Sequence, residues 1–154
     1  MRCTVVVVGK PRDAALAAAI REYETRAARY WPLDVHEVRE EPARGAPPDL
    51  VREREGERLA ARIPAGAALW ACDVGGRGFP SEEFARFLQG EREAARDLAL
   101  VVGGAFGLAP FLLARARGRL SLAPWTLPHE LARLVLAEQL YRAGTIVRGE
   151  PYHK

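Results

Sequence analysis

The chain has few of the residues on which many enzymes depend for nucleophilic or metal chemistry. Its 154 residues include two cysteines, three histidines and two serines. Cys3 and Cys72 both lie inside apolar runs, so they resemble small buried hydrophobic residues rather than a disulfide framework or a zinc site. His36, His129 and His153 have no metal-ligand spacing with one another. We therefore expect no metal centre.

Long hydrophobic runs and several signature motifs are also missing. The first apolar run stops at Gly9, which is too short for a membrane span and lacks the flanks of a signal peptide, so we expect a cytoplasmic protein. The absence of a G-x-S-x-G elbow argues against acyl-transfer hydrolysis. The stretch "LVVGGAFG", residues 100–107, is glycine-rich but matches neither phosphate-binding pattern. It predicts a ligand loop for something other than phosphate.

Charge is unevenly distributed along the chain. The formal net charge is +3, but residues 111–154 hold seven Lys and Arg against three Asp and Glu, whereas residues 1–110 are nearly balanced. A basic last third is compatible with a polyanionic partner, and equally with an ordinary solvated surface.

Hydrophobic patterning predicts that strands and helices alternate. The expected strands are 3–8, 33–39, 67–74, 98–104 and 119–123, and the expected helices follow Asp13, Asp49, Ser81, Pro110 and Pro128. Side chains of Asp13, Asp49 and Ser81 are expected to cap the first three helices, and "GGRG" (75–78) to form a turn. Alternation of this kind indicates one α/β domain spanning residues 1–154, with a mostly parallel sheet covered by helices.

Three loops should meet at the carboxyl edge of that sheet, where α/β proteins bind ligands. They are residues 72–75, 103–107 and 122–127. Taken alone, the glycines of 103–107 could form no more than a tight strand-to-helix turn. The apolar, proline-containing "LAPWTLP" favours a slot for a flat heterocycle held by backbone groups.

The C-terminal region holds the remaining candidate chemistry. Arg142 follows Glu138 by one helical turn, which is usually a weak surface pair but could hold a guanidinium ready for an anionic substrate. In the terminal "PYHK", Tyr152 could stack on a base, His153 could exchange a proton and Lys154 could meet a phosphate. Composition alone would favour a frayed terminus.

Four segments together resemble one known family. "VVVVGK", "VVGGAFG", "LSLAPWTLPHELARLVLAEQLYRA" and "PYHK" are similar to the RlmH-type family of SPOUT methyltransferases, over essentially the whole chain. The resemblance implies an S-adenosylmethionine-dependent homodimer with a C-terminal trefoil knot. It also implies methylation of N3 of a pseudouridine in bacterial 23S rRNA, in helix 69 of the large subunit, on the assembled ribosome or large subunit.

Carried over onto this chain, the resemblance assigns cofactor contacts to the three loops. They are Cys72, Gly103, Gly104, Leu122, Ala123, Pro124, Trp125, Thr126 and Leu127. Where the family usually has Gly-Gly-Pro-Glu-Gly, this chain has Ala105 and Phe106 in place of Pro and Glu, so binding should depend on backbone groups.

A mechanism follows from the same resemblance. Methylation of the imide needs N3 to lose its proton. Arg142 is expected to stabilise the resulting negative charge, His153 or a water to accept the proton, Tyr152 to orient the base, and Lys154 to contact RNA. The alternative function is a non-catalytic nucleotide- or RNA-binding α/β module, and a phosphoacceptor receiver is remote because the first strand ends without an acidic pair.

Overall fold

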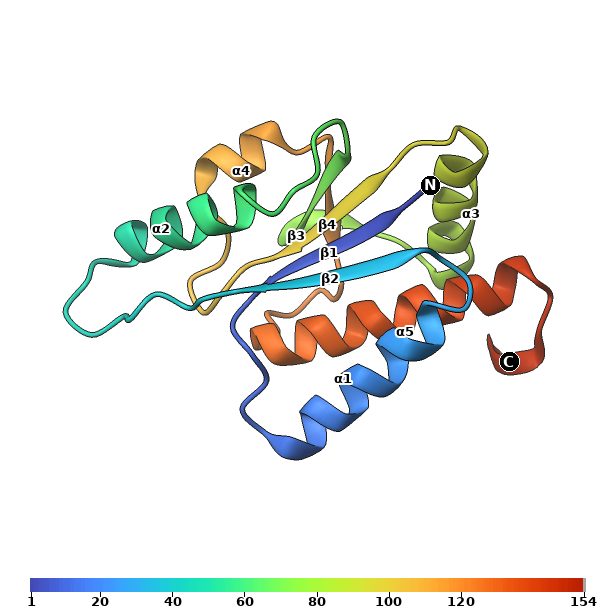
Figure 1. Cartoon of the computed structure of the whole chain (residues 1–154), viewed down its shortest axis with the longest axis horizontal. Coiled ribbons are helices and arrows are strands. Elements are labelled where there is room, and N and C mark those ends of the chain that lie inside the picture. The colour runs from blue at the N-terminus through green and yellow to red at the C-terminus, as the bar shows by residue number, and fades with distance from the viewer. Residues whose placement is uncertain (154) are drawn as a thin grey trace.

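Five parallel strands form the centre of the computed structural model, which describes residues 1–153 (Figure 1). In chain order the elements are β1 (Cys3–Val8), α1 (Ala14–Ala27), β2 (Leu33–Val38), α2 (Pro48–Ala60), β3 (Ala68–Gly78), α3 (Ser81–Glu93), β4 (Leu98–Val102), α4 (Pro110–Arg115), β5 (Gly118–Ser121), α5 (His129–Val147) and the short 3-10 helix η1 (Pro151–His153). The strand order is β2-β1-β4-β3-β5, and every pairing is parallel. The predicted α/β fold is confirmed.

Two layers of helices cover the sheet because the central strands are apolar on both faces. Along β1, Cys3, Val5 and Val7 join one core cluster, whereas Val6 and Val8 join another. The first cluster lies under α1, α3 and α5, and the second under α2 and α4 (Figure 1). The parallel arrangement brings the carboxyl ends of the strands, and the loops that follow them, to one edge.

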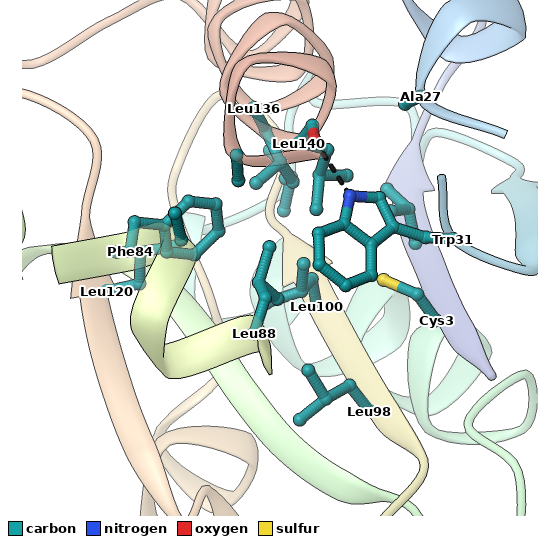
Figure 2. Packing of buried hydrophobic residues seen from close by; sticks show 14 of the residues in the cluster. Cys3, Ala27, Trp31, Phe84, Leu88, Leu98, Leu100, Leu120, Leu136 and Leu140 are labelled. Carbon is teal, nitrogen blue, oxygen red and sulfur yellow. Dashed lines mark hydrogen bonds between the residues drawn. The ribbon is translucent and has the colours of Figure 1, made fainter. Parts of the chain in front are cut away.

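Trp31 is the largest side chain in the first cluster (Figure 2). It is fully buried, and its indole N–H donates to the backbone carbonyl of Leu140 at 2.8 Å. The guanidinium of Arg92 lies 4.0 Å from the centroid of its ring system. Trp31 thus joins the turn after α1 to both α3 and α5.

Two of the expected helix caps are wrong. The Asp13 carboxylate does accept the backbone N–H of Leu16, at 2.8 Å, as predicted for α1. However, α2 and α3 begin after Pro47 and Pro80, and neither has a side-chain cap. Asp49 lies inside the first turn of α2 and pairs with Arg52, while Ser81 is the first residue of α3 and donates to Gln139 at 2.9 Å. A proline that precedes the helix holds the extended backbone of the cap position instead.

The expected turn at 75–78 is also wrong, because β3 continues to Gly78. The strand bulges between Cys72 and Arg77, and both residues pair with Leu120 of β5. A side chain at Gly76 would come within 2.7 Å of the Arg119 backbone. The glycines therefore allow two backbones to approach closely at a bulge.

Two further points of the sequence analysis concern membrane-spanning segments and the trefoil knot. Within residues 1–153, no helix combines the length and the apolar character that a membrane crossing requires. The trefoil knot that the family resemblance implies stays a prediction.

The buried indole gives a test of this packing. We expect Trp31→Ala to lower the free energy of unfolding by about 3–5 kcal/mol, since it leaves a large cavity and removes a buried hydrogen bond. Trp125→Ala is the matched control, because that side chain is 75% exposed, and it should change stability by less than about 0.5 kcal/mol. Urea unfolding of both variants measures the difference, and equal shifts would contradict this account of the core.

Candidate functional site

A pocket opens at the carboxyl edge of the sheet, between the ends of β3, β4 and β5 and the start of α5. Counted with its open mouth, it occupies about 700 Å³. Of the nine predicted cofactor contacts, eight line it: Cys72, Gly103, Gly104, Leu122, Ala123, Trp125, Thr126 and Leu127. Pro124 belongs to the same loop but is not among the lining residues. The structure therefore brings the three predicted loops together.

The glycine loop forms one wall of the pocket through a tight turn. The Gly107 N–H donates to the Gly104 carbonyl at 3.0 Å, and Gly107 has a φ of +80°. Ala105 and Phe106 occupy the two central positions of this turn, which accept most residue types. The turn thus forms without the proline and glutamate that are usual in the family.

Close backbone contacts explain why this wall needs glycine. A side chain at Gly103 would lie 2.6 Å from the carbonyl carbon of Gly107. One at Gly104 would lie 2.5 Å from Oε2 of Glu55, a buried carboxylate oxygen with no hydrogen-bond partner among the described residues. Gly103 therefore excludes larger residues because it faces backbone, whereas a larger residue at Gly104 would have to displace the end of the Glu55 side chain.

Cys72 and Asp73 provide the opposite wall from β3. Burial raises the pKa of the Cys72 thiol to about 12, so this residue stays neutral and contributes an apolar surface. The Asp73 carboxylate lies 3.8 Å from the Arg119 guanidinium and is the one acidic side chain in the pocket lining of the described chain. No lysine or arginine appears in that lining. The pocket is consequently suited to a neutral or cationic ligand rather than a phosphate.

Several lining residues are not predicted by the sequence arguments. His129, the first residue of α5, and Ala132 one turn later line the pocket outside the three predicted loops, whereas Asp73 and Val74 lie in the predicted loop 72–75 without being predicted cofactor contacts. For His129 the sequence indicates only that it has no metal-ligand spacing with another histidine. Its place directly after "LAPWTLP" is the signal that could have identified it, because a residue that follows a ligand loop shares its surroundings.

Two of the residues predicted to handle the substrate base, Arg142 and Tyr152, lie elsewhere. They form a cluster with Tyr23 and Glu138, which we call the α5–tail cluster. Arg142 donates to Glu138 Oε1 from Nε at 2.9 Å and from Nη2 at 2.6 Å, which confirms the expected i,i+4 pair. The Tyr152 hydroxyl donates to the same oxygen at 3.1 Å and lies 3.3 Å from the Tyr23 hydroxyl. The C-terminal residues are therefore folded against α1 and α5.

His153 lies at the exposed end of this segment, in η1. Its Nδ1 is 3.1 Å from the backbone carbonyl oxygen of Glu150. A carbonyl oxygen can only accept, so this contact requires the proton on Nδ1 and leaves the Nε2 lone pair of the neutral ring free. Lys154, the predicted RNA contact, lies outside the described residues.

The pocket lies beside the first turn of α5, whereas Glu138 and Arg142 of the α5–tail cluster lie in the middle and second half of that helix. Ten residues separate Ala132, in the pocket lining, from Arg142, which corresponds to about 15 Å along a helix. Within one chain, the structure therefore does not bring the predicted cofactor contacts and the predicted base-handling residues together.

The fold and the pocket define an α/β protein with a pocket at the carboxyl edge of a parallel sheet, where proteins of this class bind ligands. Comparison with known proteins agrees with this class. The family model described as "Predicted SPOUT methyltransferase" matches residues 1–153. The chain is 65% identical, over the full length of both proteins, to ribosomal RNA large subunit methyltransferase H of Gemmatimonas aurantiaca.

Proteins of the same name from other bacteria are also similar. The identity is 45% with that of an Anaeromyxobacter species, over all of both chains, and 42% with that of Geotalea daltonii, over 99% of each. The chain therefore belongs to the SPOUT methyltransferase family and, within it, to the group of ribosomal RNA large subunit methyltransferase H proteins.

The glycine wall can be tested by substitution. We expect Gly103→Ala to weaken binding of S-adenosylmethionine by about tenfold or more, because the new methyl group would displace the Gly107 backbone. Gly90→Ala is the control: nothing lies within 4 Å of a side chain there, and alanine should stabilise α3 by about 1 kcal/mol. Calorimetric titration measures both, and unchanged binding by Gly103→Ala would contradict the role of this wall.

Proposed function

We propose that this protein transfers a methyl group from S-adenosylmethionine to N3 of a pseudouridine in 23S rRNA. The target would lie in helix 69 of the large subunit, on assembled ribosomes or subunits, and such a substrate implies a cytoplasmic location. The observation that carries the proposal is the pocket: three loops of a SPOUT family member form one slot without a phosphate-binding side chain. The names of the relatives support large-subunit rRNA as the substrate.

The pocket residues fit this cofactor chemically. S-adenosylmethionine, when bound, supplies a methyl group from its positively charged sulfonium. The rest of the cofactor then leaves as a neutral thioether. The lining offers an apolar thiol at Cys72, glycine backbone at Gly103 and Gly104, and the "LAPWTL" loop for a flat ring. The single carboxylate, Asp73, suits a ligand that carries positive charge.

The α5–tail cluster supplies groups for the substrate base. Arg142 would stabilise negative charge on a carbonyl oxygen of the deprotonated ring, and its hydrogen bonds to Glu138 raise the pKa of the guanidinium, so it stays charged. His153 would accept the N3 proton at Nε2, the nitrogen that its contact with Glu150 leaves free. Tyr152 would orient the base.

A second copy of the chain would bring these groups to the pocket. Because α5 separates them by about 15 Å within one subunit, the base-handling residues of one subunit would serve the pocket of the other. Val74, Trp125 and Leu131 are exposed apolar residues on the loops and helix start around the pocket, which is typical of a surface that a partner covers. The functional form would be a homodimer with composite sites.

The first measurement of this function uses labelled cofactor. Incubation with unmethylated ribosomes should transfer label to one nucleotide of 23S rRNA, and mapping of that nucleotide identifies the target. Calorimetry with S-adenosylmethionine alone should show saturable binding. If the protein binds S-adenosylmethionine but transfers no label to rRNA, the proposed function is rejected in favour of a non-catalytic binding module.

Arg142 gives a test of the chemical step. We expect Arg142→Ala to slow methyl transfer by about 10²–10³-fold and to leave cofactor affinity nearly unchanged, since Arg142 is assigned to the substrate base and is not among the residues that line the pocket. Arg62→Ala, an exposed arginine just after α2, is the control and should retain the wild-type rate. Single-turnover kinetics measure the step, and an unchanged rate would remove Arg142 from the mechanism.

Mixed dimers test whether the site is composite. At a cofactor concentration too low to load the altered pocket, subunits with Gly103→Ala and subunits with Arg142→Ala should each have strongly reduced activity alone, whereas equal co-expression should restore about a quarter of the wild-type activity. Half of the dimers would be mixed, and each would have one site with an intact pocket and an intact arginine. No recovery would mean that each subunit uses its own Arg142.

A further inference from the structure

We propose that Glu138 is a positioning residue of the reaction, whose carboxylate holds Arg142 and Tyr152 in one fixed relation to each other. The inference rests on the proposed function, which makes Arg142 and Tyr152 the residues that touch the base. Glu138 itself would contact neither the base nor the cofactor.

One carboxylate oxygen carries this arrangement. Glu138 Oε1 accepts from Arg142 Nε at 2.9 Å, from Arg142 Nη2 at 2.6 Å and from the Tyr152 hydroxyl at 3.1 Å. These bonds place the Arg142 guanidinium 4.9 Å from the centroid of the Tyr152 ring. A single acceptor therefore fixes the separation of two side chains that come from different segments.

The other oxygen anchors the carboxylate. Glu138 Oε2 accepts from the Gln139 side-chain amide at 2.7 Å, and the carbonyl of that amide accepts from the Ser81 hydroxyl at 2.9 Å. Ser81 begins α3, so the orientation of Glu138 is linked to a second helix. Charged hydrogen bonds linked in this way restrict rotation more than an isolated ion pair does.

The geometry also leaves a donor available. Both bonds from Arg142 use the edge of the guanidinium that contains Nε and Nη2, and Nη1 has no partner among residues 1–153. Nη1 can therefore donate to a substrate carbonyl while Glu138 still holds the opposite edge. One edge of the guanidinium is thus held by Glu138 while the other can contact the substrate, as a positioning role of Glu138 requires.

A second ion pair, on α1, shows how an ordinary surface contact differs from the Glu138–Arg142 pair. Glu22 and Arg26 on α1 have the same i,i+4 spacing and the same 2.6 Å contact, but their side chains are 55% and 37% exposed, and Glu22 accepts from no other side chain in the described chain. The Glu138 and Arg142 side chains are 19% and 27% exposed. Glu22 is therefore the matched control.

A titration tests the contact without any methylation assay. Burial raises the pKa of Tyr152, and its bonds to Tyr23 and Glu138 raise it further. Tyr23 from α1, and Glu138, Arg142 and Tyr141 from α5, are the titratable groups that face it. We expect Glu138→Gln, which removes the charge and keeps the shape, to make Tyr152 ionise at lower pH.

Ultraviolet absorbance of tyrosinate measures this ionisation, with Tyr152→Phe to assign the signal. Glu22→Gln should titrate as the wild type does. If Glu138→Gln leaves the Tyr152 titration unchanged, the carboxylate does not hold this phenol and the proposal is wrong.

Kinetics test the positioning role. We expect Glu138→Gln to slow single-turnover methyl transfer by about 10- to 100-fold with unchanged cofactor affinity, and Glu22→Gln to have no effect. In a chain that already carries Arg142→Ala and Tyr152→Phe, Glu138→Gln should add less than about threefold, because its effect acts through those residues. A full additional loss would overturn the proposal.

The two hypotheses fail in different ways. If the wild-type protein transfers no methyl group to ribosomes, the proposed function is wrong, whereas a shifted Tyr152 titration would still establish the contact. If transfer occurs and Glu138→Gln retains the wild-type rate, the positioning role alone is wrong.

Discussion

The buried ion pairs of Arg133 fix the helix on which the rest of the molecule depends. Its guanidinium donates to Glu24 of α1 at 2.8 Å and to Glu37 of β2 at 2.6 Å, so α5 is tied to a neighbouring helix and to an edge strand at once. Removing either carboxylate would be costly, since the buried Arg133 guanidinium would lose a partner for a charge that is removed from water. With its position fixed, α5 places its first turn at the pocket and its middle and second half, through Glu138 and Arg142, at the α5–tail cluster.

Close packing at the other end of α5 serves the same purpose. A side chain at Gly144 would lie 2.3 Å from the Tyr30 ring, so glycine lets α5 approach the turn after α1. Tyr30 also donates to Glu150, just beyond the helix, and the Arg148 guanidinium lies 4.5 Å from the centroid of the same ring. The segment that leads to Tyr152 and His153 is thus held by contacts that local sequence patterns do not reveal.

The sequence predicted those features that depend on local patterning. Apolar runs gave all five strands, and prolines and apolar spacing gave the five α-helices, because burial of a face requires a regular period. The convergence of the loops at 72–75, 103–107 and 122–127 followed from the rule for parallel sheets. The predictions failed at Asp49, Ser81 and 75–78, where a preceding proline or a neighbouring strand decided the outcome.

The separation of the two sites needed more than patterning. The spacing of ten residues between Ala132 and Arg142 can be read from the sequence. Which end of α5 faces the pocket cannot, because it depends on how the helix packs across the sheet. The Glu138 contact with Tyr152 depends on the path of the chain after the helix, which has no periodicity to predict it. Long-range contacts of this kind arise from tertiary packing, and residue spacing along one element cannot specify them.

Under the proposed function, the separation has a chemical consequence. A methyl donor bound at the carboxyl edge of one subunit would meet no group of its own chain that holds a deprotonated base, because Arg142 lies in the second half of α5 and His153 lies beyond that helix, in η1. Assembly of two chains would create the reactive site, and the substrate would complete it. Because an in-line transfer requires the donor, the base and the proton acceptor to be aligned, a composite arrangement would confine the reaction to the assembled complex.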